Sequence, residues 1–382
     1  MNETILITGA TGLVGGNLAA RLLDTNPPSH LYLLVRGKSR EEAQHRLFAT
    51  LRAFLPHLQL STLERRTTIL CGDITKERLG LTSTEWSDAL DRVTHIVHSA
   101  ANVQFDTSLE EALAVNYLGT KNVLHFAQHA YQFGRLQRVA YISTAYTCGN
   151  RGGVIREDEL DEGQQFSNSY ERSKFESERY VRRLMHRLPI TVFRPSIIVG
   201  DSATGRTTAF NVLYVPLRLL HRGLLTILPG SRSVRLDVVP VDYVCDAIRH
   251  IFVETNDGIG ATYHLTAGAG GATTLGEVVD LAGDFFKTSD RQTKIPKVRF
   301  VAPPIIRLLL RFFRGSACRA VGLMKIFESY MTINRVFDDT NTRASLRGTA
   351  IRPPRFSSYY QTILEYSVAT AWGKRGVPAN AA

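Results

Sequence analysis

A tyrosine and a lysine one helical turn apart are the residues in this sequence whose chemistry is easiest to name. Tyr170 and Lys174 are four positions apart, so on a helix they lie on the same face. A nearby ammonium lowers the pKa of a phenol, and such a phenol can donate or accept a proton in catalysis. Tyr117 and Lys121 have the same spacing but lie inside an earlier predicted helix, whereas Tyr170 begins a helix after a predicted strand. We therefore predict Tyr170 and Lys174 as catalytic residues.

Hydroxyl groups stand where that strand ends. Ser143 and Thr144 directly follow the apolar run 138–142, so their side chains are expected at its carboxyl end. A hydroxyl there can donate a hydrogen bond to a substrate carbonyl while Tyr170 protonates it. Asn116, inside the preceding helix, is either a structural residue of that helix or a member of a proton relay. The competing interpretation of the whole set is a polar strand end beside a helix with ordinary surface ion pairs.

A glycine-rich turn comes directly after the first predicted strand. The sequence GATGLVG at residues 9–15 places glycines three positions apart where a helix begins. Glycines let the backbone approach a pyrophosphate, and free N–H groups at the start of a helix bind its charge. The alternative is a plain turn from strand to helix. The position of the turn predicts a dinucleotide site, with contacts from Gly9, Thr11, Gly12, Leu13, Val14 and Gly15.

The end of the second predicted strand favours NADP(H) over NAD. Chains that bind NAD usually place an acidic residue there for the ribose hydroxyls, but this strand ends in LLVRGK. Arg36 can stack on adenine and pair with a 2′-phosphate, although Arg36 and Lys38 also fit a solvated loop. Asp73 and Ile74 follow the third strand, where the carboxylate can accept from the adenine amino group. Ala100 lies among the small residues after the fourth strand, and these positions are also expected to contact the cofactor.

The elements that must position these residues alternate between short apolar runs and longer amphipathic segments. This alternation is typical of parallel strands joined by crossover helices, with ligands at the carboxyl ends of the strands. Strands are predicted at 4–8, 31–35, 67–71, 95–98, 138–142, 190–194 and 263–266, and helices at 15–24, 40–54, 109–131 and 169–187. The sequence predicts an α/β fold, with a Rossmann-type doubly wound parallel sheet and a smaller, mostly helical C-terminal substrate domain. We place the NADP-binding domain at 1–270, with 201–235 contributing to the substrate site, and the substrate-binding region at 271–382.

The overall charge is strongly basic. The formal net charge of the 382 residues is +11, which favours anionic partners such as nucleotide phosphates, coenzyme A, acyl carrier protein, nucleic acid or an acidic membrane surface. No RNA- or DNA-binding motif accompanies the charge, so no nucleic acid partner is expected. The four cysteines are far apart without metal-ligand spacing, which predicts reduced thiols in a cytoplasmic protein and no metal site. The N-terminus leaves no room for a signal peptide, and no apolar stretch is long enough for a spanning helix.

Much of the excess charge lies between residues 290 and 330. A predicted helix at 304–314 follows two prolines and carries Arg307, Arg311 and Arg314 on one stripe beside a broad apolar face. Two interpretations stay open. Either the helix packs on the core of the substrate domain, or it rests on a membrane surface or borders an acyl tunnel, which would make the protein peripheral to a membrane.

Further segments in the same order carry a resemblance to a known family. They are LLVR at 33–36, a helix with Arg46 and Leu47, HSAANVQF at 98–105, VNYLGT at 115–120, STAY at 143–146, FRPSIIVG at 193–200, VVPVDYV at 238–244 and FDDTNTR at 337–343. Together they resemble the extended short-chain dehydrogenase/reductase family. Within that family the chain is most similar to fatty acyl-CoA reductases and thioester reductases, which have the male sterility-type NAD(P)-binding domain.

The resemblance implies a function and assigns roles. Thr144, Tyr170 and Lys174 would be the catalytic hydroxyl, the proton donor and the ribose-binding lysine, with Ser143 as the alternative hydroxyl. Arg46 would join Arg36 at the 2′-phosphate of NADPH. The implied reaction of lipid metabolism is hydride addition to an acyl thioester of coenzyme A or of a carrier protein, giving an aldehyde and then, with a second hydride, an alcohol. The alternative is another member of the extended family that acts on a ketone, aldehyde, sterol-like alcohol or nucleotide sugar. A cofactor-binding protein without catalysis is a third reading, against which the intact catalytic set argues.

Overall fold

A seven-stranded parallel sheet forms the centre of the protein. The computed structural model describes residues 3–24, 29–255, 258–289, 294–302, 304 and 328–374. The strand order is β12-β7-β5-β4-β1-β2-β3, and every pairing in it is parallel. The strands are β1 (Thr4–Thr8), β2 (His30–Val35), β3 (Thr67–Cys71), β4 (His95–His98), β5 (Arg138–Ile142), β7 (Ile190–Pro195) and β12 (Thr262–Leu265). The order reverses between β1 and β4, so the predicted doubly wound Rossmann-type sheet is confirmed.

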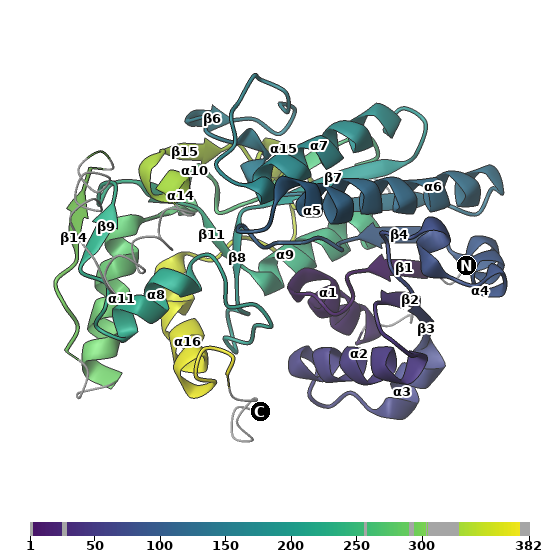
Figure 1. Cartoon of the computed structure of the whole chain (residues 1–382), viewed down its shortest axis with the longest axis horizontal. Helices are drawn as coiled ribbons and strands as arrows, with labels where there is room; N and C mark the ends of the chain where they lie inside the picture. Colours follow the sequence, from purple (N-terminus) through teal and green to yellow (C-terminus); the bar gives the residue numbers. More distant parts are fainter. Residues whose placement is uncertain are drawn as a thin grey trace.

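Helices cover both faces of this sheet, which explains why its strands are almost continuously apolar. One face packs on α1 (Leu13–Leu23), α2 (Arg40–Phe54) and α9 (Val241–Ile248). The other packs on α4 (Ser83–Arg92), α6 (Gly119–Gln132) and α7 (Ser169–Leu184). In Figure 1 α1 and α2 lie below the sheet while α6 and α7 lie above it. Because β1, β4 and β5 are parallel neighbours, their carboxyl ends lie at one edge of the sheet, which is where ligands bind in folds of this kind.

A second apolar cluster lies at the opposite end of the molecule from α3 (Leu60–Arg66) and α4 (Figure 1). Its helices are α8 (Tyr214–His221), α11 (Leu275–Ser289), α14 (Glu328–Thr332) and α16 (Phe356–Ala369). Short strands bring distant segments together there, namely β6 (Gly153–Ile155) with β15 (Arg335–Phe337), β8 (Ile197–Val199) with β11 (Val238–Pro240), β9 (Ile227–Pro229) with β14 (Arg299–Val301), and β10 (Arg235–Leu236) with β13 (Thr273–Thr274). This lobe thus combines segments before and after residue 270, and the predicted domain division stays a prediction.

The helix predicted at 109–131 is interrupted. The structure has α5 (Leu109–Leu113), then a π-helical turn at Ala114–Leu118, then α6. A π turn accommodates one extra residue in the helical register, and the apolar pattern on both sides gave no sign of it. The structure also has α4, which was not predicted, although Thr82 and Glu85 form a capping box at its start.

The basic helix predicted at 304–314 lies outside the described residues, apart from residue 304. Cys318 lies outside them as well. Both interpretations of the basic helix, packing on the substrate domain and contact with a membrane or an acyl tunnel, therefore stay predictions. Within the part of the chain that is described, no helix combines the length and the apolar character needed to cross a membrane.

Candidate active site

The glycine-rich turn between β1 and α1 brings the backbone close to the end of β4. Gly9 has a φ of +74°, and a Cβ built on it would lie 2.7 Å from the backbone nitrogen of Ala100. A Cβ on Gly15 would lie 2.4 Å from the carbonyl oxygen of Gly9. Gly12 caps α1 without any side-chain hydrogen bond to its first turn. The N–H groups of that turn and the space that a side chain would fill are what a pyrophosphate requires, so the residues present fit a dinucleotide.

A cavity of about 570 Å³ opens above this turn. Its lining includes eight of the residues predicted for the cofactor, namely Gly9, Thr11, Gly12, Arg36, Arg46, Asp73, Ile74 and Ala100. Leu13 and Val14 line a second, adjoining cavity instead, and Gly15 packs beneath the turn without lining either one. The volume falls within the range of ligand and cofactor pockets, about 300 to 1,000 Å³. We call it the cofactor cavity.

Two arginines stand at the edge of the cofactor cavity where the second strand ends. Arg36 and Arg46 are both exposed, and the Arg46 guanidinium donates to the backbone oxygen of Arg36. This contact brings a residue of α2 beside the residue that follows β2. Across the cavity, Asp73 Oδ1 accepts hydrogen bonds from the backbone nitrogen and hydroxyl of Thr75 at 2.9 and 2.8 Å. The cavity therefore has two cationic groups at this edge and a carboxylate held by its own turn.

The second cavity, of about 300 Å³, contains the predicted catalytic groups. Ser143, Thr144, Tyr170 and Lys174 all line it, and most of its other lining residues are apolar. Residues that line both cavities join them, namely Thr11, Gly12, Ser99, Ala101 and Val103. A ligand that extends from the first cavity therefore reaches the reactive side chains of the second, which we call the catalytic cavity.

Tyr170 is partly exposed to the catalytic cavity and interacts with the Thr144 hydroxyl. Burial raises the pKa of Tyr170 to about 12, and its hydrogen bond with Thr144 acts in the opposite direction. The expected lowering of the Tyr170 pKa by Lys174 is not found in this structure. Because the pKa is high, the side chain is a neutral phenol at physiological pH, which is the form that donates a proton.

Lys174 has other partners. Its side chain is 3% exposed, and Nζ donates to the carbonyl oxygen of Ile142 at 2.8 Å. Nζ also lies 4.5 Å from the centre of the Tyr141 ring. Burial lowers the pKa of Lys174 to about 7, with the charge of Glu178 opposing the shift. The ammonium is thus held at the end of β5, beside the residues that line the catalytic cavity.

The two candidate hydroxyls differ in what they bind. The Ser143 hydroxyl donates to Glu178 Oε2 at 2.5 Å, so its proton is already committed. Thr144 Oγ1 accepts from the backbone nitrogen of Tyr146 at 3.3 Å, makes a long contact, 3.5 Å, with the Pro195 carbonyl oxygen, and interacts with the Tyr170 hydroxyl inside the catalytic cavity. Thr144 is therefore the hydroxyl whose proton is more readily given to a substrate carbonyl.

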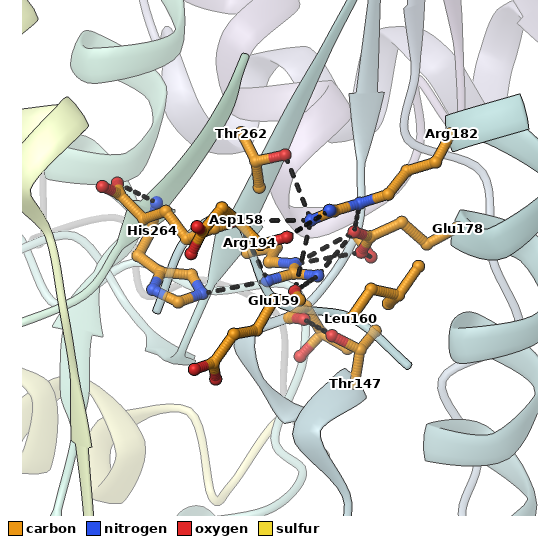
Figure 2. A network of polar contacts seen from close by, with 12 residues as sticks. Thr147, Asp158, Glu159, Leu160, Glu178, Arg182, Arg194, Thr262 and His264 are labelled. Carbon is orange, nitrogen blue, oxygen red and sulfur yellow. Dashed lines mark hydrogen bonds and ion pairs between the residues drawn. The ribbon is translucent and has the colours of Figure 1, made fainter. Parts of the chain in front are cut away.

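A buried ion-pair network behind Ser143 was not foreseen from the sequence. Glu178 is fully buried on α7, and its carboxylate accepts from Arg194 of β7 at 2.7 and 3.1 Å and from Arg182 at 3.0 Å (Figure 2). These arginines also hold backbone oxygens of the loop after β6, which Figure 2 shows around Glu159. The sequence did hold a sign of the Glu178 position, because Glu178 follows Lys174 by four residues and so lies on the same face of the predicted helix. The network fixes β5, β7 and α7 relative to one another.

Two further buried groups support the site. Asn116 lies on the π turn. Its Oδ1 accepts from the backbone nitrogen of Asn102 at 2.7 Å, and its Nδ2 donates to the backbone oxygen of Asn102 at 3.0 Å and to the Ser173 hydroxyl at 2.8 Å. These hydrogen bonds fix the loop after β4, and a role in a proton relay stays a prediction. His98, which was not predicted, lies between the hydroxyls of Thr8 at 2.7 Å and Thr120 at 2.9 Å. Burial, with the charge of Lys174, lowers the pKa of His98 to about 3, so the ring is neutral.

Comparison with known proteins identifies the family. The model of the male sterility protein family, an NAD-binding domain, matches residues 7–248. The chain belongs to the male sterility protein family. As a member of this family it is an oxidoreductase with a short-chain dehydrogenase/reductase fold, and its cofactor is a nicotinamide dinucleotide.

Relatives of this male sterility family member include two named acyl-CoA reductases. It is 23% identical to probable fatty acyl-CoA reductase 5 of Arabidopsis thaliana, over 90% of this chain and 89% of that protein. It is 26% identical to the fatty acyl-CoA reductase wat of Drosophila melanogaster over 65% of this chain, and there it spans about half, 53%, of the relative. Among solved structures, the terminal R domain from the myxalamid PKS-NRPS biosynthetic pathway is 27% identical, with a TM-score of 0.82, over 98% of this chain and 92% of that chain.

Proposed function

We propose that the protein reduces an acyl thioester, carried by coenzyme A or a carrier protein, to the aldehyde with NADPH as reductant. The observation that carries the proposal is the junction of the cofactor cavity with a mostly apolar cavity that holds Thr144, Tyr170 and Lys174. The likeness to fatty acyl-CoA reductases and to the terminal R domain of a PKS-NRPS biosynthetic pathway supports the same substrate class. When bound, NADPH supplies the hydride that adds to the thioester carbonyl carbon.

The residues of the chain supply the electrophilic assistance. Thr144 Oγ1 donates a hydrogen bond to the thioester oxygen, and Tyr170 gives that oxygen a proton as charge develops on it. As the resulting hemithioacetal collapses, its hydroxyl proton returns to the Tyr170 phenolate and the carbon–sulfur bond breaks. The aldehyde forms, and the thiol leaves as a thiolate that takes a proton from solvent. Lys174 lies where it can hold the ribose of the cofactor. A second hydride added to the aldehyde in the same cavity would give the alcohol.

The preference for NADPH over NADH is part of the proposal. Arg36 and Arg46 bring two guanidinium groups to the end of β2, where a 2′-phosphate lies in proteins with this sheet. Arginine binds phosphate through paired hydrogen bonds, whereas an acidic side chain at this position would repel it. We also propose a cytoplasmic location. Association with a membrane surface rests on the charge of the basic segment alone, and we do not propose it.

The test is to mix the purified protein with NADPH and a panel of acyl-coenzyme A thioesters, and to follow NADPH absorbance and free thiol together. We expect thiol release coupled to NADPH loss, and a fall in kcat of roughly 10²- to 10⁴-fold in Tyr170→Phe, because the proton donor is removed. In Arg36→Ala, the KM for NADPH should rise while the KM for NADH stays the same. The ratio of NADPH consumed to thiol released separates aldehyde from alcohol.

Each contrary result has a definite meaning. If NADPH binds but no thioester of coenzyme A or of a carrier protein is consumed, the thioester proposal is wrong. Oxidation of NADPH by ketones or aldehydes alone would then support the alternative, another extended-family reductase. A wild type that uses NADH as well as NADPH would contradict the assigned role of Arg36 and Arg46.

A further inference from the structure

Aromatic side chains form one wall of the catalytic cavity. Phe105, Tyr146 and Tyr330 line this cavity and are not among the residues that line the cofactor cavity, so the wall lies on the substrate side. The rings of Tyr146 and Tyr330 are 4.4 Å apart, and those of Phe105 and Tyr330 are stacked at 6.0 Å. Phe105 is also 5.3 Å from Tyr170. The wall thus extends from the proton donor to Tyr330.

Tyr330 is held in place by a buried carboxyl group. Its side chain is 4% exposed, and its hydroxyl interacts with the carboxyl group of Glu171, the residue that follows Tyr170. Glu171 is fully buried at the start of α7, and its Oε2 accepts from the backbone nitrogen of Ser167 at 3.2 Å. The Tyr330 hydroxyl and the Ser167 backbone nitrogen both interact with this buried carboxyl, so moving the ring away would remove one of its polar neighbours, which is costly in a buried position.

Arg335 holds the segments on either side of the Tyr146–Tyr330 contact together. The Arg335 guanidinium lies 5.7 Å from the centre of the Tyr146 ring and donates to the backbone oxygens of Gly149 and Ser329 at 2.9 Å each. Arg335 therefore joins α14 to the turn that carries Tyr146. In a closely packed wall of this kind, a side chain that contacts the ligand limits the size of the ligand, because the residues packed around that side chain leave it no space to move into.

We propose that Tyr330 is a specificity-determining residue, whose ring closes the catalytic cavity on the substrate side and sets the largest acyl group that the site accepts. The inference rests on the proposed function, because it concerns the acyl part of the thioester. It assigns a substrate class with an apolar acyl chain of limited size. Because Tyr330 lines the catalytic cavity and not the cofactor cavity, the limit acts on the acyl group rather than on the cofactor.

The test compares acyl groups of increasing size in Tyr330→Ala and wild type. One readout is kcat/KM for straight-chain acyl-coenzyme A thioesters from acetyl to stearoyl. The other is the dissociation constant of S-alkyl coenzyme A thioethers of the same lengths, measured with NADP⁺ present. The thioethers have no carbonyl to reduce, so they report size independently of turnover. In Tyr330→Ala, affinity for the first chain that the wild type rejects should rise roughly tenfold or more, since even one methylene changes discrimination about 10- to 200-fold.

Two variants serve as controls, and a third repeats the test with a milder change. Tyr359→Ala removes an equally buried ring from the same apolar cluster, but Tyr359 lines neither cavity, so the size limit should stay where it is. Tyr330→Phe keeps the ring and should keep the limit. Tyr330→Leu is a milder truncation that keeps the test possible if the alanine variant does not fold, and it should move the limit in the same direction.

The outcomes separate the two proposals. If thioesters are reduced but the size limit is the same in wild type, Tyr330→Ala and Tyr330→Leu, the inference is overturned and the proposed function stands. If no thioester is reduced but the truncations admit longer thioethers, the inference stands and the proposed function fails. Failure of the wild type to bind any thioether of the series overturns the inference.

Discussion

Lys174 is a buried cation, and its titration should be visible in the stability of the protein. Burial lowers the pKa of Lys174 from the 10.5 usual for a lysine to about 7, so between these pH values the unfolded chain binds more protons than the folded one. Stability therefore rises with pH from 7 towards 10.5, and the full cost of the buried charge is present below pH 7. Lys174→Met removes that cost. The stability gained by the variant should be largest below pH 7 and should shrink by up to about 1.4 kcal/mol per pH unit above it.

Urea unfolding at pH 6, 8 and 9.5 measures this change. Lys121→Met is the matched control, because Lys121 has the same spacing from a tyrosine but lies outside both cavities. A difference between Lys174→Met and wild type that is independent of pH would show that the folded protein does not lower the pKa of this lysine.

The identity of the reactive residues could be predicted from the sequence, but their partners could not. The spacing of Tyr170 and Lys174 placed them on one helix face, and both line the catalytic cavity. The prediction that Lys174 lowers the Tyr170 pKa was wrong, because Nζ is held by the Ile142 carbonyl instead. That carbonyl belongs to another element, and local spacing carries no information about it. Tyr330 was missed for the same reason, since it follows Tyr170 by 160 positions.

At the scale of elements, α7 positions the catalytic side chains relative to β5 and β7. Tyr170, Lys174 and Glu178 follow one another by a helical turn, and Glu178 joins α7 to β5 and β7. Glu178→Gln replaces a buried anion between two arginines with a neutral amide. Breaking a buried pair in this way costs about 3 to 5 kcal/mol, because it leaves buried cationic groups without their counter-charge. Chemical denaturation should show a loss of this size.

Glu176→Gln is the control on the same helix. Glu176 pairs with Arg172 and Arg179 at the surface, so its loss should change stability by less than about 1 kcal/mol. Equal effects of the two substitutions would show that the network around Glu178 contributes no more than a surface pair.

The predicted strands agree with the structure to within one residue, whereas helices and connections agree less well. Strands of a parallel sheet are buried on both faces, so their apolar runs are sharply bounded in the sequence. The break at Ala114–Leu118 was missed because a π turn changes the register without changing the apolar composition. The short strands of the second lobe, such as β6 with β15, pair across long stretches of chain and have only two or three residues each. No local pattern could have predicted them.

At the scale of the whole molecule, Glu157 joins the second lobe to the central sheet. Its side chain is 2% exposed, and its carboxylate accepts from the backbone nitrogens of His264, Asn341 and Thr342 at 2.9, 2.6 and 3.3 Å. It follows β6, so one side chain connects β12, β6 and the start of α15 (Thr340–Ser345). Glu157→Gln puts an amide N–H₂ opposite N–H donors and should cost about 1 to 3 kcal/mol of stability.

Thermal unfolding of Glu157→Gln measures that cost, and Glu159→Gln provides the comparison. Glu159 forms a partly exposed ion pair with Arg151 at 2.9 Å, which contributes about 0 to 1 kcal/mol. If the midpoint falls no further in Glu157→Gln than in Glu159→Gln, the carboxylate does not hold the two parts together.

The long separation of these partners has a consequence for how the protein is made. Glu157 and Asn341 are 184 residues apart, and a ribosome adds roughly 5 to 20 residues each second. Asn341 is therefore synthesised about 10 to 40 s after Glu157, and β15 and Tyr330 belong to the same late stretch. The strands of the sheet can assemble during this interval while the Glu157 carboxylate stays in water. The aromatic wall of the catalytic cavity closes only afterwards, so a nascent chain has its cofactor turn well before it has a complete substrate site.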